Sequence, residues 1–273
     1  MKIGVVIASS RFSKERAKAV DAWFAQNIPD RSISVVFHPA CFLKHGHFAG
    51  DDRARAEAFI EFANDPRIDA VWFGRGGYGS CRIAEAVVPR LTEAARKKAY
   101  MGYSDAGSLL AALYKAGFPH LAHGPMASDV LRSDATAWRA LDWFARRDPA
   151  ALEPSLLDDP RPAAAFNLTI LDQLVGTALE PDLAGHVLML EEVSEALYRV
   201  DRMMFHLTGQ DSIRKVAGIR LGRVSDVTEN DPDFGQTPEE IVRYWCLRSG
   251  IPFLGSADIG HDADNKVVPF GKR

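Results

Sequence analysis

Residues 99–117 decide the fold; they read Ala-Tyr-Met-Gly-Tyr-Ser-Asp-Ala-Gly-Ser-Leu-Leu-Ala-Ala-Leu-Tyr-Lys-Ala-Gly. The apolar run Ala99–Tyr103 predicts a buried strand, and Asp105–Ala116 predicts a helix that ends at Gly117. A strand followed at once by a helix is the repeating unit of a parallel α/β sheet. We therefore expect the neighbouring segments to show the same alternation.

The rest of the first half does alternate in this way. Short apolar runs predict strands over Lys2–Ala8, Ser32–Phe37 and Ile68–Phe73. Helices are predicted over Lys14–Gln26, from the residue after Asp51 through Phe62, over Ile83–Val88 and over Thr136–Arg147. Ser13 caps the first of these helices, and Asp51 caps the second. The pattern predicts βαβ units around a parallel sheet.

The second half has a different rhythm. Strands are predicted over His186–Leu190, Val216–Leu221, Pro252–Leu254 and Val267–Phe270. One helix is predicted over Ser194–Leu207, ending at Gly209. Another begins at a Thr237–Glu240 capping box and ends at Gly250.

Prolines interrupt the chain between Asp148 and Pro162 and exclude a helix or central strand there. We interpret residues 149–162 as a linker between an N-terminal domain (1–148) and a C-terminal domain (163–273); the alternative is a long surface loop within one domain. The predicted fold class is α/β. It has an N-terminal parallel-sheet α/β domain and a smaller C-terminal domain with mixed strands and helices.

The composition is that of a globular protein. Of 273 residues, 47% are apolar and 25% are charged, which excludes intrinsic disorder. With 33 basic and 36 acidic residues, the chain has no basic field to attract nucleic acid or an anionic membrane, so we expect neither as a partner. The three cysteines are odd in number and form no CxxC, which favours free thiols. The first apolar stretch is too short for a signal peptide, and we expect a soluble cytoplasmic protein.

The strongest local motif is Gly102-Tyr103-Ser104-Asp105-Ala106. Ser104 lies where a predicted strand turns into a predicted helix, which exposes a nucleophilic hydroxyl at the carboxyl edge of a sheet. The backbone N–H of Asp105 would then face a developing oxyanion. The motif differs from G-x-S-x-G only at Ala106, and the alternative is that Ser104 simply caps the helix.

A glycine-rich loop, Gly74-Arg75-Gly76-Gly77-Tyr78-Gly79, follows the strand Ile68–Phe73. It satisfies G-x-G-x-x-G, so a dinucleotide-binding oxidoreductase must be considered. That fingerprint normally follows the first strand, however, and this strand is the third. The loop could instead present N–H groups to an oxyanion beside Ser104, or be a tight turn.

A serine nucleophile needs a base and an orienting carboxylate. His123 and His261 both follow predicted strands, and spacing does not choose between them. Glu191 lies at the end of the strand His186–Leu190, and Glu192 would face the other way. Among other candidates, His38, Cys41, His45 and His47 form a cluster whose spacing matches no familiar zinc site, so we expect a polar loop and no metal there.

Together these motifs resemble the LD-carboxypeptidase family, serine peptidases of murein recycling that include the microcin C immunity peptidases. The resemblance runs from the first strand to the last residues. It rests on five motifs in matching order: Arg75–Gly79, Gly102–Asp105, His123-Gly124-Pro125-Met126, Leu190–Val193 followed by Tyr198-Arg199-Val200-Asp201-Arg202, and Gly260-His261 with Val268-Pro269-Phe270-Gly271.

The resemblance implies a Ser104–Glu191–His261 triad. It also implies an oxyanion hole of the Gly77 and Asp105 N–H groups and a substrate loop of Arg75, Gly76 and Tyr78. The implied fold has the serine in an N-terminal α/β domain and the other two residues in a C-terminal domain.

The implied reaction is hydrolysis of the L–D bond of murein tetrapeptide, with release of D-alanine. It needs no metal or organic cofactor, and a homodimer is left open. The alternative substrate is a microcin C-like peptide–nucleotide.

Arg75 has two interpretations. A carboxypeptidase must bind a free terminal carboxylate, and a guanidinium could do so bidentately. Alternatively, Arg75 braces its loop by bonding to backbone carbonyls.

Three departures from the family pattern concern the substrate pocket. They are Ala165-Phe166 where Gly-Gly is usual, Ala8 before Ser9-Ser10 where proline is usual, and the acidic Asp262 and Asp264 where glycine and proline are more frequent.

Overall fold

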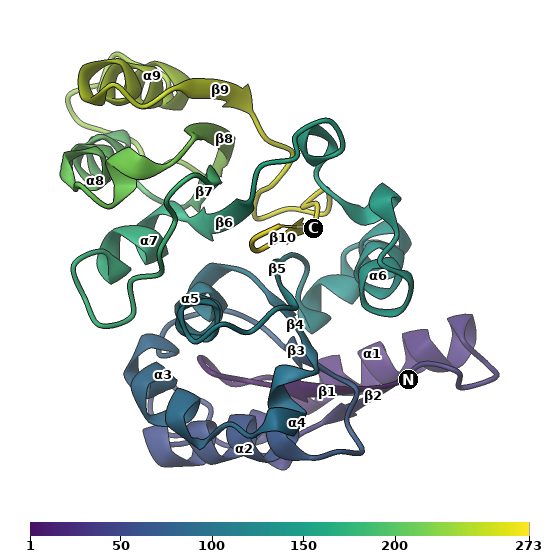
Figure 1. Cartoon of the computed structure of the whole chain (residues 1–273). Helices are drawn as coiled ribbons and strands as arrows, with labels where there is room; N and C mark the ends of the chain where they lie inside the picture. The colour runs from purple at the N-terminus through teal and green to yellow at the C-terminus, as the bar shows by residue number, and fades with distance from the viewer. Residues whose placement is uncertain (273) are drawn as a thin grey trace.

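The computed structural model describes residues 1–272, which form two α/β units, each built on its own sheet (Figure 1). The first sheet has six strands in the order β10-β5-β4-β3-β1-β2. Its strands are β1 (Lys2–Val6), β2 (Ser34–Phe37), β3 (Ala70–Phe73), β4 (Ala99–Gly102), β5 (Leu121–His123) and β10 (Val268–Pro269). Strands β1 to β5 are parallel, and β10 pairs antiparallel with β5. The predicted parallel α/β unit is confirmed.

The helices of this unit cover both faces of its sheet. They are α1 (Lys14–Asn27), α2 (Asp52–Asn64), α3 (Cys81–Val87), α4 (Glu93–Arg96), α5 (Gly107–Lys115) and α6 (Asp134–Leu141). Apolar residues of α2, α3 and α5 pack with Val71 and Phe73 on one face, whereas α1 and α6 pack with Trp72 and Met101 on the other. Alternating strand residues thus serve two cores.

The second sheet has four parallel strands in the order β6-β7-β8-β9. Its strands are β6 (Ala163–Asn167), β7 (Val187–Val193), β8 (Gly218–Ser225) and β9 (Phe253–Ser256), and its helices are α7 (Leu168–Leu174), α8 (Leu197–Gly209) and α9 (Pro238–Ser249). Both β6 and α7 were missing from the sequence prediction. The segment Ala-Ala-Ala-Phe-Asn has little of the β-branched character that marks a strand.

The predicted end signals of the helices are found where the sequence placed them. Ser13 accepts from the Arg16 N–H, Asp51 accepts from the Ala54 N–H, and Thr237 forms a capping box. Gly250 takes the left-handed conformation that ends α9, at φ +75°. The prediction over Thr136–Arg147 was wrong in part, because α6 ends at Leu141 and continues as one π-helical turn over Asp142–Arg146.

The proline-rich segment 149–162 is an ordered connection. It forms short 3-10 turns at Pro149–Ala151 and Pro154–Leu156, and Ala151 and Leu156 are buried. Strand β10 then returns from the C-terminal half into the first sheet, where it also lies beside β6 (Figure 1). The chain therefore ties its halves together twice, and the proposed domain boundary at 149–162 stays a prediction.

Among residues 1–272 there is no helix of the length and apolarity that crossing a membrane would require.

Candidate active site

The Ser104 turn lies at the carboxyl edge of the first sheet. Strand β4 ends at Gly102, and Ser104 then takes a left-handed backbone conformation with φ +56° before a 3-10 turn leads into α5. A non-glycine residue in this region is uncommon and often marks a functional site. The Ser104 hydroxyl makes no hydrogen bond to another group of residues 1–272, so the alternative of a simple helix cap is wrong.

The side chain of Asp105 fixes this turn from behind. Its carboxylate is buried and accepts hydrogen bonds from the Ser9 hydroxyl, the Gly79 N–H (3.2 Å) and the Ser80 N–H (2.9 Å). The Ser80 hydroxyl in turn donates to the Asp105 carbonyl oxygen. One buried carboxyl side chain therefore joins the segment after β1, the glycine-rich loop and the serine turn.

This arrangement does not support the dinucleotide hypothesis. A pyrophosphate would need the free N–H groups at the start of the helix that follows the G-x-G-x-x-G loop. At the start of α3, the Gly79 and Ser80 N–H groups already donate to Asp105.

The glycine-rich loop lies directly against the serine. A Cβ at Gly76 would stand 2.8 Å from the Ser104 hydroxyl oxygen, so only glycine fits there. Gly77 has φ +129°, and a Cβ on it would collide with Ser10. The N–H groups of Gly77 and Asp105 have no acceptor among the described residues. Ser104 is thus adjacent to one such donor, that of Asp105, and in contact with the loop that carries the other, and an oxyanion hole requires two such N–H groups.

Arg75 and Tyr78 lie at the outer side of this loop. The Arg75 Nε donates to the Gly76 carbonyl (3.2 Å) and its Nη1 to the Arg11 carbonyl (3.4 Å). These contacts fit the bracing interpretation. Tyr78 is 46% exposed and lies beside Phe48, with ring centroids 6.1 Å apart.

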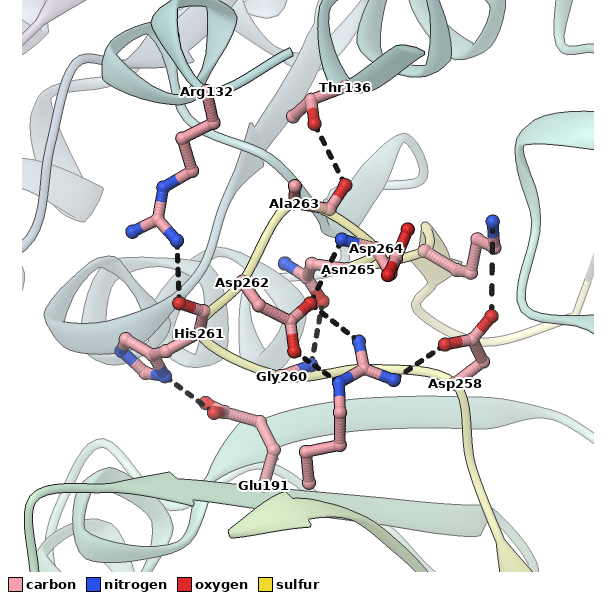
Figure 2. A network of polar contacts seen from close by, with 12 residues as sticks. Arg132, Thr136, Glu191, Asp258, Gly260, His261, Asp262, Ala263, Asp264 and Asn265 are labelled. Atoms are coloured by element: carbon pink, nitrogen blue, oxygen red, sulfur yellow. Dashed lines mark hydrogen bonds and ion pairs between the residues drawn. The ribbon is translucent and has the colours of Figure 1, made fainter. Parts of the chain in front are cut away.

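Glu191 and His261 meet from distant parts of the chain. Glu191 lies on β7 and is fully buried, and its Oε2 accepts from Nδ1 of His261 at 2.5 Å. Figure 2 shows this contact between the β7 carboxylate and the His261 ring, which comes from the loop before β10. The ring also packs on Tyr103, with centroids 4.8 Å apart, which places it next to the residue that precedes Ser104.

Glu191 and His261 both have pKa values above their ordinary ranges. Burial raises the pKa of Glu191 above its usual range. Burial alone would lower the pKa of His261, but the hydrogen bond and charge of Glu191 outweigh it, so the His261 pKa is raised. The carboxylate therefore stabilises an imidazolium, which is the species that forms when a histidine removes a proton from a serine.

Comparison with known proteins identifies the family of this chain. The model of the LD-carboxypeptidase N-terminal domain matches residues 3–124, and that of the LD-carboxypeptidase C-terminal domain matches residues 164–273. The chain belongs to the LD-carboxypeptidase family.

Several known proteins are similar to this chain over most of its length. The murein tetrapeptide carboxypeptidase of Pseudomonas aeruginosa is 28% identical, over 84% of this chain and 79% of that protein. The muramoyltetrapeptide carboxypeptidase of Oxalobacter formigenes has a similar structure, with a TM-score of 0.81 and 22% identity over 99% of this chain and 93% of the other. The microcin C7 self immunity protein MccF in complex with aspartyl sulfamoyl adenosine also has a TM-score of 0.81, at 19% identity over 99% and 91% of the two chains. These structural similarities show a shared LD-carboxypeptidase fold.

His123, the other candidate base, has a different environment. It is buried, and its Nε2 lies 3.3 Å from the side-chain oxygen of Asn265. Burial and the nearby His261 lower the pKa of His123 to about 3, so its ring stays neutral at physiological pH. Of the two histidines, His261 is therefore the one that is hydrogen-bonded to a carboxylate.

Glu192 faces away from His261, as strand phasing predicts, but it is not a surface charge. It is 2% exposed, and its carboxylate accepts from Asn167 Nδ2 (2.7 Å), the Thr169 N–H (2.8 Å) and hydroxyl (2.7 Å), and the Val193 N–H (2.8 Å). Sequence reasoning missed this role, because β6 and α7, which supply most of the donors, had not been predicted. Glu192 joins β6, β7 and the first turn of α7.

The histidine and cysteine cluster separates in the structure. Cys41 is buried in the core, His38 pairs with Glu61 at 3.1 Å, and His47 lies 3.0 Å from the Ser10 hydroxyl. No group of His, Cys, Asp or Glu suited to a metal ion is found within residues 1–272.

The loop that carries His261 is held by Arg223 of β8. The Arg223 guanidinium donates through Nη1 to Asp258 (2.6 Å) and through Nη2 and Nε to Asp262, at 2.9 Å for the Nη2 contact. Asp262 also accepts from the Asp264 N–H at 2.9 Å. Asp258 and Asp262 therefore form an ion-pair clamp with Arg223 next to His261 (Figure 2), and Asp264 contributes only its backbone N–H.

Side chains of the first unit hold the same loop by its carbonyl groups. Arg132 donates to the His261 carbonyl (2.6 Å), and Thr136 donates to that of Ala263 (2.8 Å). Arg139 bonds to the carbonyls of Ala263 (2.8 Å) and Asn265 (3.0 Å). Both halves of the molecule thus fix the position of the histidine.

We predict that Glu192→Gln lowers the stability of the fold. The neutral amide loses charge-assisted hydrogen bonds, and groups that bind a charged partner contribute about 1.5–3 kcal/mol each. Denaturant unfolding should show a reduced midpoint. The matched control is Glu239→Gln on the surface of α9, which should shift the midpoint little. Equal midpoints for Glu192→Gln and the wild type would contradict the prediction.

A second prediction concerns the clamp. Arg223→Met keeps much of the side-chain volume but frees the loop, and a displacement of about 1 Å at a catalytic group can reduce turnover a hundredfold. We expect kcat for peptide hydrolysis to fall by about tenfold to a hundredfold, with a smaller change in KM. Arg243→Met, which removes a surface ion pair of α9, serves as the control. The clamp would have no positioning role if both variants kept full kcat.

Proposed function

We propose that this protein is a serine carboxypeptidase that uses Ser104, His261 and Glu191 as its catalytic triad. The observation that supports this most strongly is the buried Glu191 carboxylate bonded to His261 Nδ1, with the His261 ring packed beside the strained Ser104 turn. A nucleophile at a sharp strand-to-helix turn, a histidine and an orienting carboxylate are the parts of such a triad.

The proposed chemistry follows from the roles of these groups. The Ser104 oxygen attacks the scissile carbonyl carbon while His261 Nε2 takes the hydroxyl proton. The oxyanion accepts hydrogen bonds from the Gly77 and Asp105 N–H groups. The protonated His261 then gives its proton to the leaving amine, and water hydrolyses the acyl-enzyme with the same base. Glu191 holds the tautomer with the proton on Nδ1 and offsets the imidazolium charge. Protons and electrons balance without a metal or organic cofactor.

For the substrate, we propose a free murein tetrapeptide cut at its terminal L–D bond, with release of D-alanine. The support comes from the relatives, which include the murein tetrapeptide carboxypeptidase of Pseudomonas aeruginosa at 28% identity. Incubation with this tetrapeptide and detection of D-alanine by mass spectrometry tests the proposal. If the intact peptide persists, the substrate assignment falls.

A second candidate is hydrolysis of a microcin C-like peptide–nucleotide. The observation in its favour is the exposed ring of Tyr78, which lies beside Phe48 at the glycine-rich loop and could stack on a base. Comparing kcat/KM for the murein tetrapeptide and for aspartyl sulfamoyl adenosine separates the candidates. Faster hydrolysis of the nucleoside compound would favour the second.

Replacing the proposed nucleophile should abolish turnover. Ser104→Ala removes the oxygen that forms the acyl-enzyme, so we expect kcat to fall on the order of 10⁶-fold while circular dichroism shows a folded protein. His261→Ala should be similarly severe, and His123→Ala should be milder. Activity of Ser104→Ala within about tenfold of the wild type would exclude Ser104 as the nucleophile.

The pH dependence should show the influence of Glu191. Activity needs neutral His261, and because the pKa of His261 is raised, kcat/KM should rise with pH through a midpoint above the ordinary histidine value of about 6.5. In Glu191→Gln the stabilising charge is lost, so the His261 pKa should fall. NMR titration of the ring would measure it. An unchanged midpoint would show that Glu191 does not control His261.

A further inference from the structure

A carboxypeptidase must recognise the free carboxylate at the end of its substrate. Because an unpaired buried anion costs several kcal/mol, a cation or a set of N–H donors must lie about one residue beyond the scissile bond. Adjacent Cα atoms are about 3.8 Å apart, so this group must lie near the histidine that protonates the leaving amine. The inference that follows rests on the proposed function.

Arg75 is poorly placed for this task. Two of its three guanidinium nitrogens already donate to the Gly76 and Arg11 carbonyls. Arg223 and Arg139 are also engaged, the first by two carboxylates and the second by backbone carbonyls.

Arg132 is held rigidly beside the histidine. Its Nε lies 2.9 Å from the carboxylate of Asp129, which is 3% exposed and also accepts from the Met126 N–H at 2.8 Å. Its Nη1 donates to the His261 carbonyl at 2.6 Å. These contacts fix both the position and the plane of the guanidinium.

The remaining donors of Arg132 are free for a ligand. A guanidinium carries five N–H groups; the hydrogen bond to the His261 carbonyl uses one of those on Nη1, and the ion pair with Asp129 is made at Nε. Both N–H groups of Nη2 and the second of Nη1 are left, and the side chain is 41% exposed. One edge of the His261 ring is turned away from Glu191. In Figure 2, the Arg132 guanidinium lies on the same side as this edge. The two Nη atoms have the spacing that binds a carboxylate bidentately.

We propose that Arg132 binds the terminal carboxylate of the substrate and thereby selects peptides with a free C-terminus, whereas Arg75 braces the glycine-rich loop. The carbonyl bond from Arg132 to His261 then couples recognition to catalysis. The group that holds the leaving residue also holds the loop that delivers its proton.

The test compares a tetrapeptide with a free C-terminus and the same peptide with an amidated C-terminus. In the wild type, kcat/KM should be higher for the free acid. Arg132→Gln should reduce the acid-to-amide ratio of kcat/KM by about tenfold to a hundredfold, the usual effect of losing hydrogen bonds to a charged group. Arg132→Lys should restore part of the ratio, because it keeps the charge but not the fork. Arg75→Gln should lower kcat/KM for both substrates by the same factor and leave the acid-to-amide ratio unchanged.

A purely structural role for Arg132 would give the opposite pattern, with acid and amide losing the same factor, and that result would overturn the proposal. A wild-type enzyme that does not discriminate would overturn it as well. Calorimetric binding of both peptides to Ser104→Ala, with and without Arg132→Gln, provides an assay that needs no turnover. Suppose that the wild type releases no terminal residue, but that Ser104→Ala binds the free acid more tightly than the amide and loses this preference when Arg132→Gln is added. The proposed function then fails, and the recognition site stands. If this preference survives Arg132→Gln, the recognition site fails.

Discussion

The buried carboxylate of Asp105 is the constraint on which the candidate site depends. Ser104 is held at φ +56°, a conformation that costs a non-glycine residue on the order of 1–3 kcal/mol. Three donors from Ser9, Gly79 and Ser80 converge on the next side chain. Since each hydrogen bond to a charged group contributes about 1.5–3 kcal/mol, the network is strong enough to offset the strain. The same bonds bring the glycine-rich loop against the serine, so one interaction sets both the nucleophile and the proposed oxyanion donors.

The position of Glu191 and His261 in the site depends on contacts between residues far apart in sequence. Glu191 lies on the second sheet, whereas His261 lies on a loop whose carbonyl groups are bound by Arg132, Thr136 and Arg139 of the first unit. The chain reaches this loop from β9 and then enters the first sheet as β10. Hinge motion between the units would therefore break several charge-assisted hydrogen bonds at once, which favours a site that is assembled before substrate arrives.

Local signals in the sequence were enough to predict much of the fold. Caps such as Ser13 and Thr237 depend on neighbouring residues, and alternating strands and helices follow from apolar periodicity. The pairing of Glu191 with His261 came only from the family resemblance, because spacing carries no information about contacts between residues 70 positions apart. Strand β6 escaped prediction because alanine has a low strand propensity, and the buried role of Glu192 escaped with it.

The acidic stretch after His261 shows how an ion pair can restrict a loop. A proline ring would fix the backbone covalently. Here Asp262 fixes the loop by pairing with Arg223 and accepting from the Asp264 N–H. Both partners of this ion pair are roughly one-third exposed, so solvent screens the attraction and its contribution to overall stability is modest. The main contribution of the Asp262–Arg223 ion pair is to the geometry of the loop. A bidentate contact defines both distance and orientation, and this restricts the backbone beside the histidine without a rigid ring.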